Sequence, residues 1–200
     1  MLKIRNFIRD KKYCLLYRYR LKNHNFTILA NNCIAGMIYH DLKEKFKSPT
    51  INLWINCQDY VKFVKNISYY KELELVFLEN KDYPKAILGD ITVNFLHYKS
   101  ETEARSKWKE RIARINLDNT FLIMVERDGC DVPLMKEFDN LPYKNKVILT
   151  HKEYPDIKSS YYIKGYENEQ ELGDILKYKS IFKRYYDQFD FVKFLNTNEK

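Results

Sequence analysis

Glycine and proline are scarce in this chain of 200 residues, with five of each. This scarcity argues against a disordered or low-complexity protein, and 45% hydrophobic with 31% charged residues is typical of a globular one. The four cysteines, at positions 14, 33, 57 and 130, include no C-x-x-C pair, which argues against a zinc ribbon or a thioredoxin-type redox pair. We therefore expect four reduced thiols, as in cytoplasmic proteins.

Long hydrophobic runs are also missing from the sequence. No segment approaches the roughly 18 consecutive apolar residues of a membrane-spanning helix. The charged N-terminus is not followed by an apolar stretch and a small-residue cleavage site, so we expect no secretory signal. The length fits one domain well and two poorly. These features together predict a single cytoplasmic domain.

The positive charge of the chain is concentrated at one end. The net charge is +8, but residues 1–22 carry +7 of it and the remaining residues only +1. The body of the protein therefore has almost no excess charge with which to hold phosphate groups, and we expect no nucleic-acid partner.

Residues 1–25 are predicted to form a basic amphipathic segment. Its apolar residues recur at helical spacing among the cations. They are Ile4, Phe7, Ile8, Leu15, Leu16 and Tyr19. One interpretation is a helix that lies on an anionic membrane surface, with residues 1–22 holding the protein at the inner face of the cell membrane. The other is a helix that packs on the domain with its lysines in water.

Residues 26–200 alternate between strand and helix patterns and are predicted to form one α/β domain. The expected strands are 26–30, 51–55, 73–78, 86–88, 91–93, 121–125 and 147–149. The expected helices are 37–46, 58–70, 100–115, 134–141 and 184–195. The run 121–125 is uniformly apolar, as in a strand buried on both faces, and Gly89-Asp90 indicates a two-residue hairpin turn. We expect a mixed, partly parallel sheet with helices on both faces and at least one β-hairpin, a Rossmann-like arrangement.

Three polar runs follow predicted strands and are the candidate chemistry of the chain. They span residues 31–36, 126–131 and 150–154. In open α/β sheets, ligands bind beyond the carboxyl ends of the strands. If the three strands are parallel neighbours, the three runs converge on one crevice.

The first run contains Asn31, Asn32, Cys33 and Gly36. Backbone N–H groups at the start of the following helix would suit phosphate or another anion, although one glycine does not make a dinucleotide fingerprint. The alternative is an ordinary turn. Cys33 near a helix start would have a lowered pKa if exposed, with His40 or His151 as its base. The alternative is a small core residue.

The second and third runs contain candidate carboxylate, cationic and acid/base side chains. Glu126 and Asp128 are placed as a carboxylate pair that could hold Mn²⁺ or Mg²⁺ on a pyrophosphate, and Arg127 could bind phosphate or carboxylate. The alternative is that Asp128 or Asp131 caps the next helix. His151 is placed for general acid/base catalysis.

Several of these motifs together resemble a known bacterial family. They are Asn31-Asn32-Cys33-Ile34, Gly36, Ile38-Tyr39-His40-Asp41-Leu42, Ser48-Pro49-Thr50-Ile51-Asn52-Leu53, Gly89-Asp90, His97-Tyr98, Trp108, Arg111, Arg127-Asp128-Gly129-Cys130 and Thr150-His151-Lys152. Over about residues 25–165 the chain resembles bacterial exopolysaccharide or capsular polysaccharide biosynthesis proteins of unknown function. The resemblance implies a setting near glycosyltransferases and no particular reaction. Where that family often shows two glycines, this chain has Ala35-Gly36.

The leading hypothesis is a transferase that acts on a sugar or sugar nucleotide during polysaccharide assembly. Asp128 would bind phosphate or act as base, and His151 would be the acid/base. Substrate would contact Asn31, Asn32, Gly36, His40, Arg127 and Lys152. The alternatives are acyl transfer through Cys33, or a non-catalytic, membrane-peripheral partner of glycosyltransferases.

Overall fold

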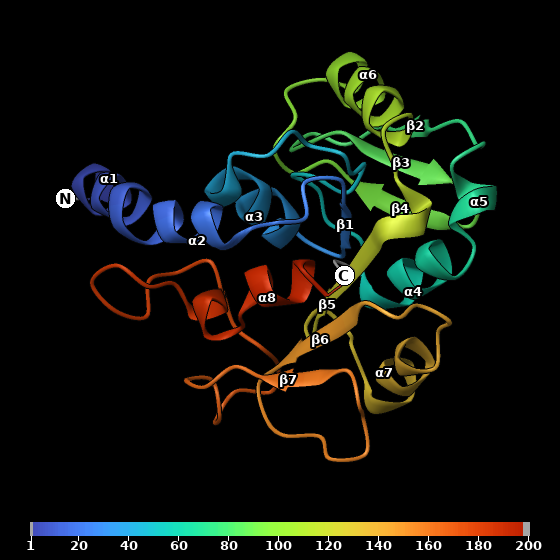
Figure 1. Ribbon diagram of the computed structural model, residues 1–200. Coiled ribbons are helices and arrows are strands. Elements are labelled where there is room, and N and C mark those ends of the chain that lie inside the picture. Colours follow the sequence, from blue (N-terminus) through green and yellow to red (C-terminus); the bar gives the residue numbers. More distant parts are fainter. Residues whose placement is uncertain (1, 198–200) are drawn as a thin grey trace.

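Two β-sheets organise the chain in the computed structural model, which describes residues 2–197 (Figure 1). Met1 and residues 198–200, which the predicted segments 1–25 and 26–200 include, lie outside the described residues. The larger sheet is parallel, in the order β1-β5-β6-β7. Its strands are β1 (Thr27–Ala30), β5 (Thr120–Val125), β6 (Lys146–Thr150) and β7 (Ser160–Tyr162). The smaller sheet is antiparallel and contains β2 (Val76–Leu78), β3 (Lys85–Leu88) and β4 (Ile91–Asn94).

The parallel sheet is covered on both faces. Side chains of its strands alternate between two hydrophobic cores, so that all six residues of β5 are buried. One core includes α4 (Cys57–Lys65), α6 (Glu101–Ile112), α7 (Val132–Asp139) and the small sheet. The other includes α3 (Ile34–Leu42) and α8 (Phe191–Leu195). The predicted α/β class with helices on both faces is confirmed, and the hairpin proves to belong to its own sheet.

Local sequence signals account for several element boundaries. The Ser100 hydroxyl accepts a hydrogen bond from the Glu103 N–H at 3.1 Å and starts α6. Asp131 caps α7 by accepting from the Leu134 N–H at 2.9 Å. Gly89 adopts φ +63° at the β3–β4 turn, as a two-residue hairpin loop requires. Caps and turns of this kind are local. The sequence analysis predicted the turn at Gly89-Asp90 and a helix from residue 100, and it gave Asp131 as one of two alternative caps.

Three predicted helices have different bounds in the structure. The helix expected at 58–70 is interrupted at Asn66, which separates α4 from α5 (Ile67–Tyr70). The helix expected at 37–46 starts at Ile34 and ends at Leu42, and the cap residue Lys43 takes a left-handed conformation. The helix expected at 184–195 consists of a 3-10 turn, η3 (Tyr185–Gln188), and the short α8. Apolar spacing alone does not reveal such interruptions.

The strand predicted at 51–55 was wrong. Asn52 adopts φ +59°, which breaks the extended run. Trp54 forms a single antiparallel bridge with Asn94, and the Ile55 N–H donates to the Asn31 carbonyl at 2.9 Å. This short segment therefore connects the end of β4 to the end of β1, and it links the two sheets rather than extending either.

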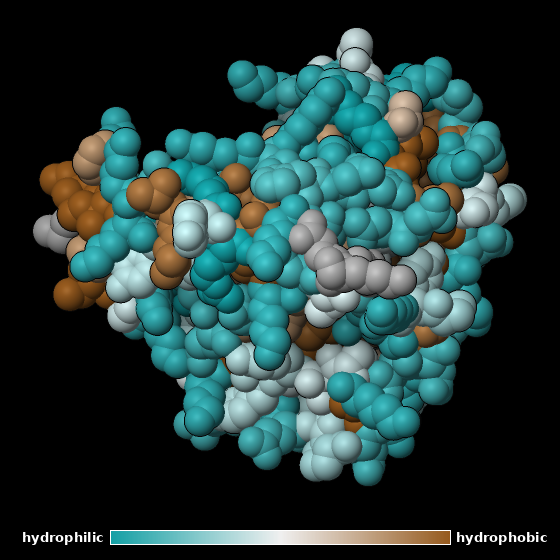
Figure 2. All heavy atoms as spheres, viewed as in Figure 1, coloured by the Kyte–Doolittle hydropathy of each residue, from teal (hydrophilic) through white to brown (hydrophobic). Residues whose placement is uncertain are grey.

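The N-terminal residues form one continuous helical rod that packs on the domain. It runs through α1 (Leu2–Arg9), the π-helical turn η1 (Asp10–Cys14) and α2 (Leu15–Arg20). The packing alternative is thus observed for one face of the rod, where Cys14 is buried. Apolar side chains of its other face, among them Ile4 and Phe7, remain exposed at the α1 end (Figure 2). Within residues 2–197, no helix has the length and apolar character needed to cross a membrane.

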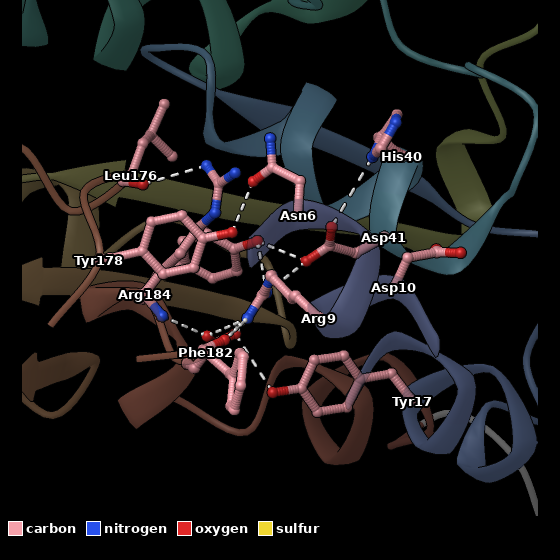
Figure 3. Close-up of polar contacts among 12 residues, drawn as sticks. Asn6, Arg9, Asp10, Tyr17, His40, Asp41, Leu176, Tyr178, Phe182 and Arg184 are labelled. Atoms are coloured by element: carbon pink, nitrogen blue, oxygen red, sulfur yellow. Dashed lines mark hydrogen bonds and ion pairs between the residues drawn. The ribbon is translucent and has the colours of Figure 1, made fainter. Parts of the chain in front are cut away.

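Arg9 fastens this rod to the domain (Figure 3). Its guanidinium lies 2.5 Å from Asp41 of α3 and 2.5 Å from Asp187 of η3. It also donates to the Tyr186 hydroxyl at 2.9 Å. Arg9 is 2% exposed, so its guanidinium lies in the interior, between two carboxylates. Next to it, Arg18 donates to the Asp41 carbonyl at 2.8 Å.

Candidate functional site

The three polar runs do converge at one edge of the parallel sheet. β1, β5 and β6 are parallel neighbours, and their carboxyl ends lead directly into Asn31, Glu126 and His151. Residues of the first two runs line a cavity at this edge, whereas no residue of 150–154 belongs to its lining. The structure then separates the members of the runs into residues that face inward and residues that line a cavity.

Asn31 faces inward and is fully buried. Its side-chain oxygen accepts from the Val125 N–H at 2.9 Å, and its amide donates to the Val125 carbonyl at 3.1 Å. The same amide donates to the Cys57 sulfur at 3.3 Å. Asn31 thus joins the ends of β1 and β5, and these contacts occupy the groups that were expected to bind a sugar.

Glu126 and His151 form a second inward-facing group. Glu126 accepts from the His151 N–H at 2.8 Å, and the same carboxylate oxygen lies 2.7 Å from His151 Nδ1. The Tyr154 hydroxyl donates to the other carboxylate oxygen. Burial, together with the Glu126 charge, raises the pKa of Tyr154. Glu126 and His151 are 3% and 4% exposed, so this group ties the ends of β5 and β6 together beneath the surface.

A cavity of about 430 Å³ opens beside these buried groups. Its lining residues come from six separate stretches of the chain. They are Asn32, Cys33, Trp54, Tyr83, Leu96, Arg127, Asp128, Asp174, Ile175 and Leu176. Ligand pockets commonly have volumes of about 300–1,000 Å³ and combine apolar walls with a few polar groups. The size and lining of this cavity are those of a small-molecule site.

Asp128 is held in an unusual conformation at the cavity. It adopts φ +58°, a left-handed backbone that aspartate tolerates better than most residues. Its N–H donates to Glu171 at 2.7 Å. Its carboxylate oxygen Oδ2 accepts from Trp54 Nε1 and from Arg127 Nε, both at 3.1 Å. Strained backbone of this kind often marks functional sites, and here it aims a carboxylate at the cavity.

Arg127 supplies the cation of the cavity. Its Nε donates to Asp128, and within residues 2–197 no hydrogen bond from its two terminal nitrogens to protein is found. Those nitrogens form the planar fork that binds phosphate or carboxylate in a bidentate manner. Arg127 and Asp128 are each about one-third exposed, so a ligand can reach both.

The remaining polar lining comes from the start of α3 and from a distant segment. Asn32 accepts from the Ile34 N–H at 3.1 Å, which is an ordinary turn contact. The Cys33 thiol points to the Leu53 carbonyl, 3.8 Å away. Burial and the nearby Asp174 raise the pKa of Cys33, so the lowered pKa that we expected for an exposed thiol does not apply. In the described part of the chain, no hydrogen bond joins Cys33 to a histidine.

Three predicted ligand residues lie elsewhere. Gly36 is buried in α3, where an added Cβ would come within 2.9 Å of the Asn52 side-chain oxygen, so close packing explains the glycine. The exposed His40 side chain lies near Asp41, at 3.7 Å, on the side of the N-terminal rod. Lys152 is exposed, with its Nζ 5.4 Å from the centre of the Tyr154 ring. None of the three belongs to the cavity lining.

The carboxylates do not form the metal site that the sequence suggested. Glu126 points inward to His151 and Tyr154, whereas Asp128 points to Trp54 and Arg127. Across residues 2–197, no cluster of three or more histidine, cysteine, aspartate or glutamate side chains has a geometry suited to a metal ion. This donor arrangement does not fit a cation held between Glu126 and Asp128.

Comparison with known proteins places this chain in a family of uncharacterised function. Residues 3–196 match the family described as a domain of unknown function, DUF1919. The chain belongs to this family. It is also 45% identical over 179 residues to an uncharacterized protein of Haemophilus influenzae, with 88% of this chain and 87% of that protein covered. Neither description names a reaction, a substrate or a pathway. The match begins at residue 3, so the basic N-terminal segment is part of the family domain.

Sequence reasoning missed several residues of the cavity. The strand predicted at 51–55 included Trp54. Two features could have indicated a turn there: tryptophan is rare in this chain, and the nearby Asn52 is a residue type that tolerates the left-handed backbone it adopts. The wall formed by Asp174, Ile175 and Leu176 comes from an irregular segment with no periodic pattern. It reaches the site because the Leu172 N–H donates to the Glu126 carbonyl at 2.8 Å.

Proposed function

We propose that this protein is a transferase of surface polysaccharide biosynthesis, exopolysaccharide or capsular, that binds a sugar in the cavity at the carboxyl ends of β1 and β5. One observation carries the proposal: Asp128 is fixed with its carboxylate in the cavity, between the Trp54 indole and the Arg127 guanidinium. The family resemblance of the sequence supplies the biological setting.

The three side chains match the parts of a sugar that carries one acidic group. The indole of Trp54 offers an apolar face for the ring. Arg127 offers its free fork to a phosphate or carboxylate. Asp128 accepts a hydrogen bond from a sugar hydroxyl. The lining contains one cation against the two carboxylates of Asp128 and Asp174, which favours a single anionic group over a polyphosphate in the cavity itself.

In the proposed reaction, Asp128 acts as general base. The hydroxyl oxygen of the bound sugar attacks the anomeric carbon of a sugar-nucleotide donor, and the hydroxyl proton passes to the Asp128 carboxylate. The bond from the anomeric carbon to the nucleotide phosphate breaks, and the nucleoside diphosphate leaves with the electron pair. Glu126 and His151 act as positioning residues in this scheme, because they hold the strand ends that carry Arg127 and Asp128.

The geometry gives less support to acyl transfer through Cys33. That reaction needs a thiolate and a base within hydrogen-bond reach. The pKa of Cys33 is raised, and its thiol contacts a backbone carbonyl.

The test is a thermal-shift screen of the full chain against hexose phosphates, uronic acids and sugar nucleotides. A ligand at 100 times its Kd stabilises the native state by about 2.7 kcal/mol, which is readily seen as a higher melting temperature. We expect a shift with a sugar that carries one acidic group. We expect Asp128→Asn and Arg127→Met to abolish it. Asparagine tolerates the left-handed backbone, so the first variant removes charge without adding strain.

Asp118→Asn is the matched control. Asp118 is exposed in η2 (Leu117–Asn119), next to the amino end of β5, at the opposite edge of the sheet from the cavity. This variant should keep the full ligand shift. An absence of any shift across the screen, or a shift that survives in both cavity variants, would overturn the proposal.

A further inference from the structure

The exposed face of the N-terminal rod is apolar and cationic. Ile4, Phe7, Leu15 and Tyr19 are all more than half exposed, and Phe7 and Tyr19 reach 63% and 88%. Together with Lys11 they recur at intervals of three or four residues, the spacing that places side chains on one face of a helix. Leu16 widens this face, with 51% of its surface exposed. We call this set the outer face of the rod.

The outer face is fixed toward solvent by the contacts of the opposite face. Arg9 is bonded to Asp41, Asp187 and Tyr186 in the interior (Figure 3). Tyr17 contributes a further contact, in which its hydroxyl donates to Asp187 at 3.2 Å. The rod therefore cannot roll to bury its outer face without exposing these buried charges. Single exposed apolar residues are common in proteins, but a row of them on one helix face indicates a docking surface.

The charge around this face is of one sign. Lys3, Lys11 and Lys12 are exposed on the rod. The acid of the rod, Asp10, is engaged with Arg18 and with Lys43, whose Nζ lies 3.8 Å away. Hydrogen bonding to Arg18 lowers the pKa of Asp10, and this lowering is consistent with an internal pairing. The outer face thus presents lysines and apolar side chains together, with its acid already paired.

A neighbouring loop extends the same surface. Arg5 donates to the Ile181 carbonyl at 3.0 Å and to the Ser180 carbonyl at 2.8 Å, which ties the loop before η3 to the rod. Ile181 itself is 68% exposed. Figure 1 shows this loop beside α1, and Figure 2 shows apolar side chains gathered at the same end of the molecule.

We propose that the outer face docks on the surface of an anionic lipid bilayer, with the rod lying in the plane of the interface. Apolar side chains would enter the boundary between head groups and acyl chains, while the lysines contact lipid phosphates. A second copy of this chain fits less well, because a two-fold contact would bring the same lysines against each other. This inference concerns a different surface from the cavity and does not rest on the proposed function.

The test is co-sedimentation of the full chain with vesicles. One set contains phosphatidylcholine alone, and the other contains 30% phosphatidylglycerol. We expect at least tenfold tighter binding to the anionic vesicles, and a marked loss of that binding in 0.5 M salt. The variant Phe7→Ser/Leu15→Ser should weaken binding at least tenfold. Each lysine of Lys3, Lys11 and Lys12 that is replaced by glutamine should weaken it about fivefold, since one cation contributes about 1 kcal/mol near such a surface.

Matched controls change the same residue types elsewhere. Val76→Ser alters a 62% exposed side chain on the edge strand β2, and Lys81→Gln/Lys136→Gln/Lys158→Gln removes three exposed lysines away from the rod. These variants should bind anionic vesicles as the wild type does. Circular dichroism and melting temperature establish that every variant is folded.

Two results would overturn the proposal. The first is equal binding of wild type and outer-face variants to anionic vesicles, or no binding by either. The second is a dimer, seen by light scattering without lipid, that Phe7→Ser/Leu15→Ser dissociates; the outer face would then be an interface between copies. Sugar binding in the cavity should be unchanged in the outer-face variants, so the two proposals fail separately.

Discussion

Arg9 shows how one residue can decide the orientation of a whole segment. By spacing alone it is one of many cations in residues 1–22. In the structure it is buried between Asp41 and Asp187, which come from elements far apart in the sequence. Burial opposes the charged form, but the surrounding carboxylates and Tyr186 more than offset this and raise the pKa of Arg9. The guanidinium therefore stays charged in the interior.

Removal of this guanidinium should be costly. We expect Arg9→Met to lower the free energy of unfolding by about 3–5 kcal/mol, because it leaves two buried carboxylates without their partner. Urea unfolding of the two proteins at pH 7 measures the difference. Arg5→Met removes exposed contacts to two loop carbonyls and to the Tyr178 ring, and it should cost about 1 kcal/mol. Equal losses in the two variants would contradict a special role for Arg9.

The cysteines should react slowly in the native protein. Burial raises the pKa of Cys14 to about 12, and it also raises that of Cys33, so little thiolate exists at neutral pH. Alkylation by iodoacetamide at pH 7.5, followed by mass spectrometry, should label these two residues slowly in buffer and rapidly in urea. Rapid native labelling of Cys33 alone would instead support its role as a nucleophile.

At the scale of elements, the end of α7 is tied to the chain before β7. The Asp139 carboxylate accepts from the Lys158 N–H at 3.1 Å and from the Ser159 N–H at 2.8 Å. Partial burial acts to raise the pKa of Asp139, but the hydrogen bonds from Ser159 and Lys158 outweigh it and lower the pKa below 3.8. The carboxylate is thus favoured in the folded state.

This lowering predicts a pH dependence of stability. A carboxyl group with a depressed pKa in the folded protein contributes stability above its unfolded pKa, and that contribution is lost as the pH falls through the folded value. We expect Asp139→Asn to reduce the free energy of unfolding by about 1 kcal/mol at pH 7. The difference from wild type should shrink as the pH falls below about 3.8, as measured by urea unfolding across the range. A constant difference at all pH values would contradict this account.

Most elements were predictable because their signals are local. The uniformly apolar run of β5, the Ser100 cap and the Gly89 turn all gave correct elements. The failures were interruptions: Asn52 breaks an extended run and Asn66 breaks a helix, although the flanking apolar pattern continues through both. Hydrophobic spacing reports which residues are buried, whereas a break depends on the backbone partners that each residue finds.

At the scale of the molecule, stability should be uneven. β5 has parallel neighbours on both sides and is buried along its whole length, whereas residues 166–183 contain no helix or strand. Hydrogen exchange followed by mass spectrometry should therefore show the slowest exchange in peptides covering 120–125 and the fastest in those covering 166–183. A sugar bound in the cavity should slow exchange around residues 174–176. Equal protection of the two regions would contradict this picture.

The candidate site was predictable in position but not in membership. Parallel strands end at the same edge of a sheet, so the order of strands and polar runs was enough to predict that the runs after β1, β5 and β6 lie together. The sequence did not reveal which side chains open to the cavity. The side chain of Asn31 points inward and hydrogen-bonds β5, and Glu126 and His151 point inward and hydrogen-bond each other. Arg127 and Asp128 line the cavity instead.

The sequence by itself determined the α/β class, the doubly buried central strand and the concentration of cations at one end, because these follow from local pattern and composition. Only the tertiary structure decided that Arg9 is buried and that Phe7 and Tyr19 are left exposed. It also brought Asp174 to the same cavity as Arg127 and Asp128. These outcomes depend on backbone hydrogen bonds and ion pairs between residues that are distant in the chain, and such partners leave no mark in the spacing of either segment.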